Sequence, residues 1–317
     1  MPALPFPPLP RRALLGSAIR AAVFLGTIAS SARSPTQAAE PPERVVDGLQ
    51  SLYTFEALVN GVIPDRAGVG EGIDLRIGKP QGVRFQAGRM GLDLPVVIAS
   101  DGPATRLTQA LRQAQQFALE VWITPAEGEQ TGPARIVSLS LDRSKRSFSL
   151  VQEKGRYELR LRTSTTSDNG TPATPTPDGT AIHRQTHLVA TRTPDGVVRL
   201  FLDGQEVATN TVAGDMNRWP DDCRLVVGNE VSGDRPWRGE IALVAIYARA
   251  LSADEIARNF AAGPPQIEEA VSLPPGQSES IDVVGERNPL FPGLCFGTRG
   301  SHGMLFRGSW FGADHRE

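Results

Sequence analysis

The chain has 317 residues, of which 40% are hydrophobic and 21% are charged, as is ordinary for a globular protein. Its formal net charge of -2 argues against a nucleic-acid-binding protein held by phosphate neutralisation. The 32 glycines and 26 prolines are high counts, and they fit many short strands joined by turns.

Residues 1–38 are predicted to be an export signal. They contain arginines but no Asp or Glu, and the uncharged run at 21–32 has the length of a signal core. Arg11 and Arg12 resemble a twin-arginine signal, whereas Arg20 interrupts the apolar region, so Sec export stays open. An ordinary N-terminal helix is the alternative. The signal predicts an exported protein, periplasmic or extracellular, with residues 39–49 as a linker.

The next two hundred residues are predicted to be mainly β-structure. Short apolar or alternating runs are separated by Gly, Pro, Asp and Asn, a pattern typical of strands and turns. The expected strands are 52–55, 72–77, 83–86, 117–125, 134–141, 147–152, 157–163, 187–192, 197–202, 224–229 and 240–249. This spacing predicts an all-β fold, a two-sheet antiparallel jelly-roll sandwich. No segment outside the signal reaches about 18 apolar residues, so no membrane span is predicted.

Two short helices are expected beside the strands. Residues 105–114 place Leu107 and Leu111 on one face. The second helix begins at Ser252, with Glu255 three residues later as its capping-box partner, and it stops at Gly263. The Thr- and Pro-rich segment 163–180 lacks apolar side chains, so a mobile surface loop is predicted there.

Two Asp-Gly pairs interrupt the strands near residue 200. Asp195 precedes Gly196, and Asp203 precedes Gly204, which is the residue order expected in tight hairpin turns. Both aspartates are therefore interpreted as turn residues and not as catalytic groups.

Beyond Gly263 the alternation is lost. Residues 264–317 are rich in Pro and Gly and are predicted to be poorly ordered, so the domain should fold without them. The two cysteines, Cys223 and Cys295, are far apart and are not expected to form an obligatory disulfide. No Cys/His grouping has zinc-ligand spacing.

Several segments together resemble laminin-G-like, concanavalin A-like jelly-roll domains. The segments are FALEVWITP, HLVATRTPDGVVRLFLDGQEV, DRPWRGEIALVAIYARALSADEI, YTFEALVNGVIPDRAGVGEGIDL and GPARIVSLSLDRSKRSFSLVQ, and they occur in the family's order over residues 50–263. The resemblance implies two stacked antiparallel sheets in an exported bacterial protein that binds glycans, other surface polymers or proteins. Some such domains bind calcium, and Asp65 is the corresponding ligand here. Ala242 stands where the family commonly places an Asp, so one acidic ligand is missing.

The candidate binding residues lie in two polar turns. They are Trp219, Asp221, Asp222, Asp234, Arg235 and Trp237. Indole faces beside carboxylates suit sugar stacking and hydrogen bonding to hydroxyls, so the two turns are predicted to form one ligand-binding rim without metal. In the alternative interpretation, each Trp caps the edge of the sandwich.

The leading functional prediction is a recognition domain without catalytic activity that binds carbohydrate or another extracellular polymer. A structural or protein-interaction spacer is the alternative, and a glycan hydrolase comes third. A hydrolase needs two carboxylates about 5 Å or about 6.5–9.5 Å apart. The central strand offers only Glu120, and Glu206 follows a turn, so no enzyme activity is predicted.

Overall fold

The computed structural model describes residues 42–56, 58 and 61–265. The chain divides into two units, residues 1–267 and 268–317, and all of the described residues belong to the first. The expected signal at 1–38, the linker residues 39–41 and residues 266–317 of the expected tail lie outside the described residues.

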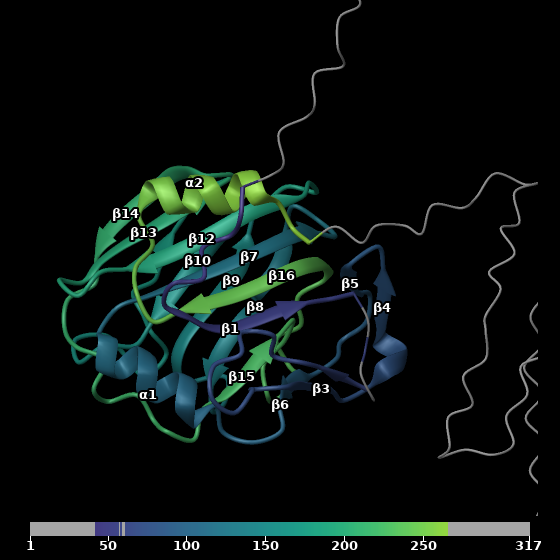
Figure 1. Ribbon diagram of the computed structural model, residues 1–317, viewed down its shortest axis with the longest axis horizontal. Helices are drawn as coiled ribbons and strands as arrows, with labels where there is room; N and C mark the ends of the chain where they lie inside the picture. The colour runs from purple at the N-terminus through teal and green to yellow at the C-terminus, as the bar shows by residue number, and fades with distance from the viewer. Residues whose placement is uncertain (1–41, 57, 59–60, 266–317) are drawn as a thin grey trace, which may run out of the picture. The chain divides into compact units, whose positions relative to one another are not determined.

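Among the described residues, two antiparallel sheets of eight strands each form the domain (Figure 1). In spatial order, the first sheet contains β14 (Gln205–Thr211), β13 (Val197–Leu202), β12 (Thr186–Arg192), β7 (Phe117–Pro125), β16 (Gly239–Tyr247), β5 (Arg89–Leu92) and β4 (Val83–Gln86), with β1 (Leu49–Thr54) also paired to β16. The second contains β11 (Thr174–Pro175), β10 (Arg156–Leu161), β9 (Arg146–Lys154), β8 (Gln130–Ser140), β15 (Arg224–Val227), β6 (Ile98–Ser100), β3 (Leu75–Ile77) and β2 (Val62–Ile63). The predicted all-β sandwich is confirmed.

The main core lies between the two sheets, and strand alternation explains it. In β7, Leu119 and Val121 point inward and join Leu139 and Leu150 of the second sheet in one buried apolar cluster. Burying each such side chain contributes about 1.5–3 kcal/mol relative to leaving it exposed.

A second, smaller core covers the other face of the first sheet. Trp122 of β7 and Tyr247 of β16 pack there with Val45 of the N-terminal segment and Ile256 of α2 (Ala253–Ala262). Figure 1 shows α2 beside β13 and β14, and α1 (Thr105–Ala114) on the opposite side of the view. Both outward and inward residues of β7 are thus buried, which explains its nearly continuous apolar sequence.

Both helices follow the sequence prediction. Leu107 and Leu111 are the buried leucines of α1. The hydroxyl of Ser252 accepts a hydrogen bond from the backbone N–H of Glu255, and the Glu255 side chain accepts one from the backbone N–H of Ser252. This capping box confirms the start of α2, and Gly263 ends it. In the described part of the chain, neither helix is both long and apolar enough to cross a bilayer.

The hairpin between β13 and β14 also follows the prediction. Asp203 and Gly204 both have positive φ, 49° and 80°, as a type I′ turn requires. The Asp203 carboxylate accepts a hydrogen bond from the backbone N–H of His187 and pairs with Arg184 at 2.6 Å. Asp203 is therefore a turn residue that ties the hairpin to the start of β12.

The segment 163–180 differs from the prediction of a mobile loop. Thr163 and Thr176 are buried, and their hydroxyls donate to the backbone carbonyls of Ala213 and Tyr157. Residues 174–175 form β11. Because threonine hydroxyls can satisfy backbone groups, they hold this segment without an apolar cluster of its own.

Candidate functional site

The outer face of the second sheet is polar although its residues are buried. Ser138 of β8 lies opposite Ser149 of β9, and their hydroxyls are 2.7 Å apart. The flanking residues Val137 and Leu150 point to the opposite side, into the main core. Strand alternation thus places an apolar layer on the inner side and hydroxyl groups on the outer side.

Two arginines belong to this outer face. Arg135 of β8 and Arg146, the first residue of β9, are 1% and 0% exposed. The pairing of β8 with β9 shifts by one residue between the pairs Leu139–Phe148 and Ser140–Arg146. At this point β9 therefore contains one residue more than β8. This irregularity places Arg146 opposite Ser140.

The loop between β15 and β16, residues 228–238, runs beside these arginines. The backbone N–H of Arg135 donates to the carbonyl of Arg235 at 3.0 Å, and the N–H of Trp237 donates back to Gly228 at 2.9 Å. Gly228 has a φ of 74°, and a Cβ there would lie 2.3 Å from the Leu92 side chain, so any other residue would be strained and would displace Leu92. The loop is therefore closed on itself and attached to the edge of β8.

Glu230 of this loop is the one buried carboxylate in contact with the arginines, among the residues that the structure describes. It is fully buried and accepts hydrogen bonds from the Ser140 hydroxyl and the N–H of Val231. Its Oε2 lies 3.5 Å from Nε of Arg135, without hydrogen-bond geometry. We call Arg135, Arg146 and Glu230 the arginine cluster.

Several N–H donors of the arginine cluster have no hydrogen-bond partner among the described residues. Nε and Nη1 of both Arg135 and Arg146 make no hydrogen bond, whereas Nη2 of Arg146 donates to the carbonyl of Arg143. Burial and the charge of Arg146 lower the pKa of Arg135 to about 9. Burial also lowers the pKa of Arg146 to about 10, against the opposing effect of Glu230. The two cations thus share one buried carboxylate, Glu230, and the partly exposed Asp142 also offsets part of the charge of Arg146.

A surface pocket lies next to the arginine cluster, between the β8–β9 hairpin and the loop 228–238. Its lining residues are Asp142, Arg143, Ser144, Ser232 and Asp234. Arg143 and Asp234 face each other across it, with Nη1 and Oδ2 3.7 Å apart. Carboxylates, hydroxyls and a guanidinium are the groups that hydrogen-bond to sugar hydroxyls, so we call this the polar pocket.

The structure corrects the predicted role of the two tryptophans. Trp219 is 2% exposed, packs against Phe117 and Phe148, and donates from Nε1 to the carbonyl of Arg162. Trp237 is 1% exposed and donates from Nε1 to Oε1 of Gln152. Neither ring offers a face to a sugar, because both large indoles are used to fill the core between the sheets.

The predicted polar residues do not form one site. Asp221 pairs with Arg112 of α1 at 2.9 Å, and Asp222 is its neighbour in the turn that precedes β15. Asp234 and Arg235 lie in the loop that follows β15, and Asp234 alone of the predicted set lines the polar pocket. Among the described residues, no hydrogen bond or ion pair joins the two turns.

Asp65 does not fit a calcium site. Its carboxylate accepts hydrogen bonds from the N–H groups of Leu52, Ala67 and Ile73, and Arg106 lies 3.3 Å away. Calcium needs several oxygen ligands, whereas backbone donors and a guanidinium already surround this carboxylate. Within the described ranges, no three His, Cys, Asp or Glu side chains are grouped to hold a metal.

Glu120 forms a separate buried centre under α2. Its carboxylate accepts from Nε2 of His187 at 2.9 Å, from Asn259 at 2.8 Å and from the Tyr247 hydroxyl at 3.2 Å, and it also pairs with Arg44. Burial alone raises the pKa of Glu120, but His187 and Arg44 outweigh it and hold the pKa below its ordinary value. We call these five residues the glutamate hub, and they join the N-terminal segment, the first sheet and α2.

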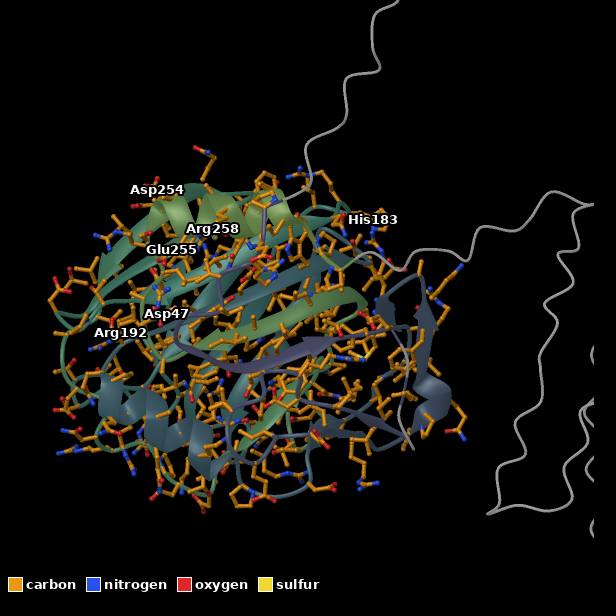
Figure 2. All side chains as sticks on the ribbon, in the orientation of Figure 1. Asp47, His183, Arg192, Asp254, Glu255 and Arg258 are labelled. Carbon is orange, nitrogen blue, oxygen red and sulfur yellow. The ribbon has the colours of Figure 1, made fainter. Side chains whose placement is uncertain are left out.

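The remaining candidate side chains have structural surroundings. Glu206 is exposed and pairs with Arg199 at 3.6 Å, whereas Glu120 is buried and pairs with Arg44. Nδ1 of His183 lies 2.7 Å from the Pro125 carbonyl, and Figure 2 shows His183 and Arg192 at opposite sides of the view. Cys223 is buried in the core, and Cys295 lies outside the described residues, so the disulfide prediction stays untested.

Sequence reasoning missed Arg135, Arg146 and Glu230. A usable signal was present, because Arg135 and Ser138 interrupt an otherwise apolar strand, and Arg146 opens the next one. What the sequence did not show is the register shift in β9 and the return of the loop 228–238 toward β8.

The comparison with protein families agrees with this fold. Residues 100–257 match the model of the concanavalin A-like lectin/glucanases superfamily, which confirms the resemblance seen in the sequence. The chain is therefore similar to this superfamily over those residues. No curated protein matches the chain.

Solved structures with this fold include an enzyme and a toxin domain. A complex of Trypanosoma rangeli sialidase with 2,3-difluoro-KDN shares 19% identity, with a TM-score of 0.50, over 73% of this chain and 36% of that chain. The binding domain of botulinum neurotoxin DC, in complex with rat synaptotagmin II, shares 13% identity with a TM-score of 0.51, over 68% and 52%. A structure of botulinum neurotoxin type C, whose cell entry depends on two ganglioside molecules, shares 13% with a TM-score of 0.50, over 68% and 51%. The chain thus matches about half or less of each of these proteins.

These likenesses correct the prediction that the chain is not an enzyme. The similarity to a sialidase shows that this fold occurs inside an enzyme, so the lack of a paired carboxylate motif does not exclude catalysis. At 19% identity the likeness shows the fold alone and assigns no reaction to this chain.

Proposed function

We propose that this concanavalin A-like domain is an exported recognition module, periplasmic or extracellular, that binds a carbohydrate or another polymer at the polar pocket. The observation that carries the proposal is the joining of two loops, 141–145 and 228–238, into a pocket of hydroxyl, carboxylate and guanidinium groups. These are the groups that fix the orientation of polar ligands in protein sites.

The position of the pocket supports this proposal. It lies beside the arginine cluster, whose unpaired N–H groups are an energetic cost unless a further partner meets them. The binding of gangliosides by a toxin of similar fold is compatible with carbohydrate recognition, although that property belongs to the toxin.

A spacer that engages only proteins is the second candidate. The burial of Trp219 and Trp237 favours it, because the domain then lacks the aromatic stacking faces that the sequence suggested. The two functions predict different results with a purified polymer: a recognition module binds it, whereas a spacer that engages only proteins does not.

Affinity electrophoresis of the full chain through gels containing purified polysaccharides tests the proposal. We expect retardation in at least one polymer, reduced severalfold by Arg143→Ala because that guanidinium lines the pocket. Arg238→Ala is the matched control, since Arg238 is similarly exposed but pairs with Glu127 elsewhere. Measuring reducing ends in the same samples shows whether a bound polymer is also cleaved.

Two outcomes contradict the proposal. Absence of retardation in every polymer would favour the spacer. Equal loss of binding in Arg143→Ala and Arg238→Ala would show that general charge, and not the polar pocket, holds the polymer.

A further inference from the structure

The arginine cluster is unusual because it is both buried and incompletely paired. Four N–H-bearing nitrogens of Arg135 and Arg146 have no hydrogen-bond partner among the described residues, and Glu230 is the one buried carboxylate there that offsets their charge. Buried cations are ordinarily paired and fully hydrogen-bonded, because an uncompensated one is costly. A site with spare donors and spare positive charge is complementary to an anion.

We infer that the arginine cluster recognises an anionic group, a carboxylate or sulfate ester, carried by the polymer that enters the polar pocket. This inference rests on the proposed function and adds the chemical class of the ligand. A guanidinium presents its N–H groups as a planar fork, which matches the two-oxygen edge of a carboxylate or a sulfate.

The arginine cluster is connected to the polar pocket through Arg143, which lines the pocket. Arg146 donates from Nη2 to the carbonyl of Arg143, and Arg143 faces Asp234 over 3.7 Å at the pocket mouth. The Arg143 and Asp234 side chains are 64% and 37% exposed, so their contact is a weak surface pair that a ligand can displace.

The acidic residues of the pocket are already engaged. The Asp142 carboxylate accepts from the N–H groups of Ser144 and Lys145, and Asp234 accepts from the Ser232 hydroxyl. Each carboxylate therefore stabilises its own turn, and Asp142 also offsets part of the charge of Arg146. The donors without a partner belong to the buried Arg135 and Arg146, which supports a preference for negative charge at the cluster and not at the rim.

The test compares the binding of three polymers to the same full-length chain: dextran, dextran sulfate and polygalacturonate. We expect at least tenfold tighter binding of one or both anionic polymers than of neutral dextran in fluorescence anisotropy. Binding of dextran sulfate alone identifies a sulfate site, and binding of polygalacturonate alone identifies a carboxylate site. Competition by inorganic sulfate then reports whether the anionic group suffices without the polymer.

Variants locate the interaction. Arg146→Gln should weaken binding of the anionic polymer at least tenfold, whereas Arg84→Gln, an exposed arginine of the first sheet, should change it less than twofold. Arg146→Lys keeps the charge but loses the planar fork, and we expect an intermediate loss. It also provides a second variant if Arg146→Gln does not fold.

Thermal unfolding separates recognition from a merely structural role. Without anion, Arg146→Gln should melt at the same temperature as the wild type or higher, because it removes repulsion from Arg135. The rise in melting temperature that dextran sulfate or polygalacturonate gives the wild type should disappear. A large drop in melting temperature without anion would overturn the inference and assign Arg146 a structural role.

The binding outcomes distinguish the inference from the proposed function. Equal binding of neutral and anionic polymers would overturn the anion site while leaving polymer recognition intact. Binding of none of a broad set of polymers would overturn both. Strong anionic binding that survives Arg146→Gln would place the charge recognition outside the arginine cluster.

Discussion

The outer faces of the two sheets each bury a charged pair, but the surroundings of the two pairs differ. Each face buries a carboxylate beside an arginine, Glu120 with Arg44 on the first sheet and Glu230 with Arg135 on the second. Glu120 also receives hydrogen bonds from three further partners of the glutamate hub, and α2 covers it. Glu230 faces two guanidinium groups whose N–H donors remain in excess.

We propose that one buried charge contributes to stability and that the other serves recognition. At the glutamate hub the chain supplies donors to both carboxylate oxygens, so the network can tie the N-terminal segment and α2 to the sheet. At the arginine cluster the chain leaves positive charge uncompensated beside an open pocket. In the first arrangement both carboxylate oxygens have donors, although Nδ1 of His187 has no partner among the described residues, whereas we propose that the second arrangement binds a ligand.

The largest expected effect is at the glutamate hub. Glu120→Ala leaves His187 and Arg44 without their carboxylate, so it should lower the free energy of unfolding by about 3–5 kcal/mol. Urea unfolding followed by circular dichroism measures this loss. Glu206→Ala is the control, and its partly exposed pair with Arg199 should contribute less than about 1 kcal/mol. A small loss in the free energy of unfolding of Glu120→Ala would show that the glutamate hub does not stabilise the first sheet as proposed.

Glu230→Gln should cost less, about 2 kcal/mol, because the amide can still accept from Ser140 and Val231. Sodium sulfate should restore part of this loss by supplying negative charge to Arg135 and Arg146. The same salt should not restore Glu120→Ala beyond the general stabilisation that it gives the wild type. Equal recovery in both variants would contradict the assignment of one face to anion recognition.

Acid should weaken the glutamate hub in a defined direction. The pKa of Glu120 in the folded protein lies below its ordinary value of 4.5. Ionised Glu120 therefore stabilises the fold fully above pH 4.5, and this stabilisation is lost as the pH falls through the folded pKa. The stability difference between the wild type and Glu120→Gln should therefore shrink as the pH falls from about 5 to about 3. Chemical denaturation at several pH values measures it, and a difference that grows on acidification would show that the folded pKa of Glu120 is raised instead of lowered.

The smallest effect is expected at the hairpin that borders the first face. Asp203→Asn should change the free energy of unfolding by less than about 0.5 kcal/mol, since Asn tolerates positive φ and can still accept from His187. Asp203→Val should cost about 1–3 kcal/mol, because a β-branched residue resists this conformation. Thermal melts of both variants measure these two changes in stability. Loss of polymer binding in a fully folded Asp203→Asn would give this aspartate a functional role.

Local patterns in the sequence determined much of the scaffold. Period-two alternation located β4, β7 and β13 at their observed bounds, and Ser252 with Glu255 predicted the start of α2. The Asp203 and Gly204 pair predicted the hairpin turn. These features depend on interactions between residues a few positions apart, so the sequence displays them directly. The short strands β2, β5, β6 and β11 were missed, because each is defined by pairing to a partner strand and not by its own alternation.

Only the tertiary structure decided the site. Trp219 and Trp237 stand in polar sequence, yet the space between the sheets takes their indoles, because burying large rings outweighs the polarity of their neighbours. Arg135 and Glu230 are far apart in sequence and meet because the loop 228–238 returns to the edge of β8. A register shift of one residue turns Arg146 toward the same face. Long-range register and loop return are set by packing of the whole domain, which is why no local pattern revealed them.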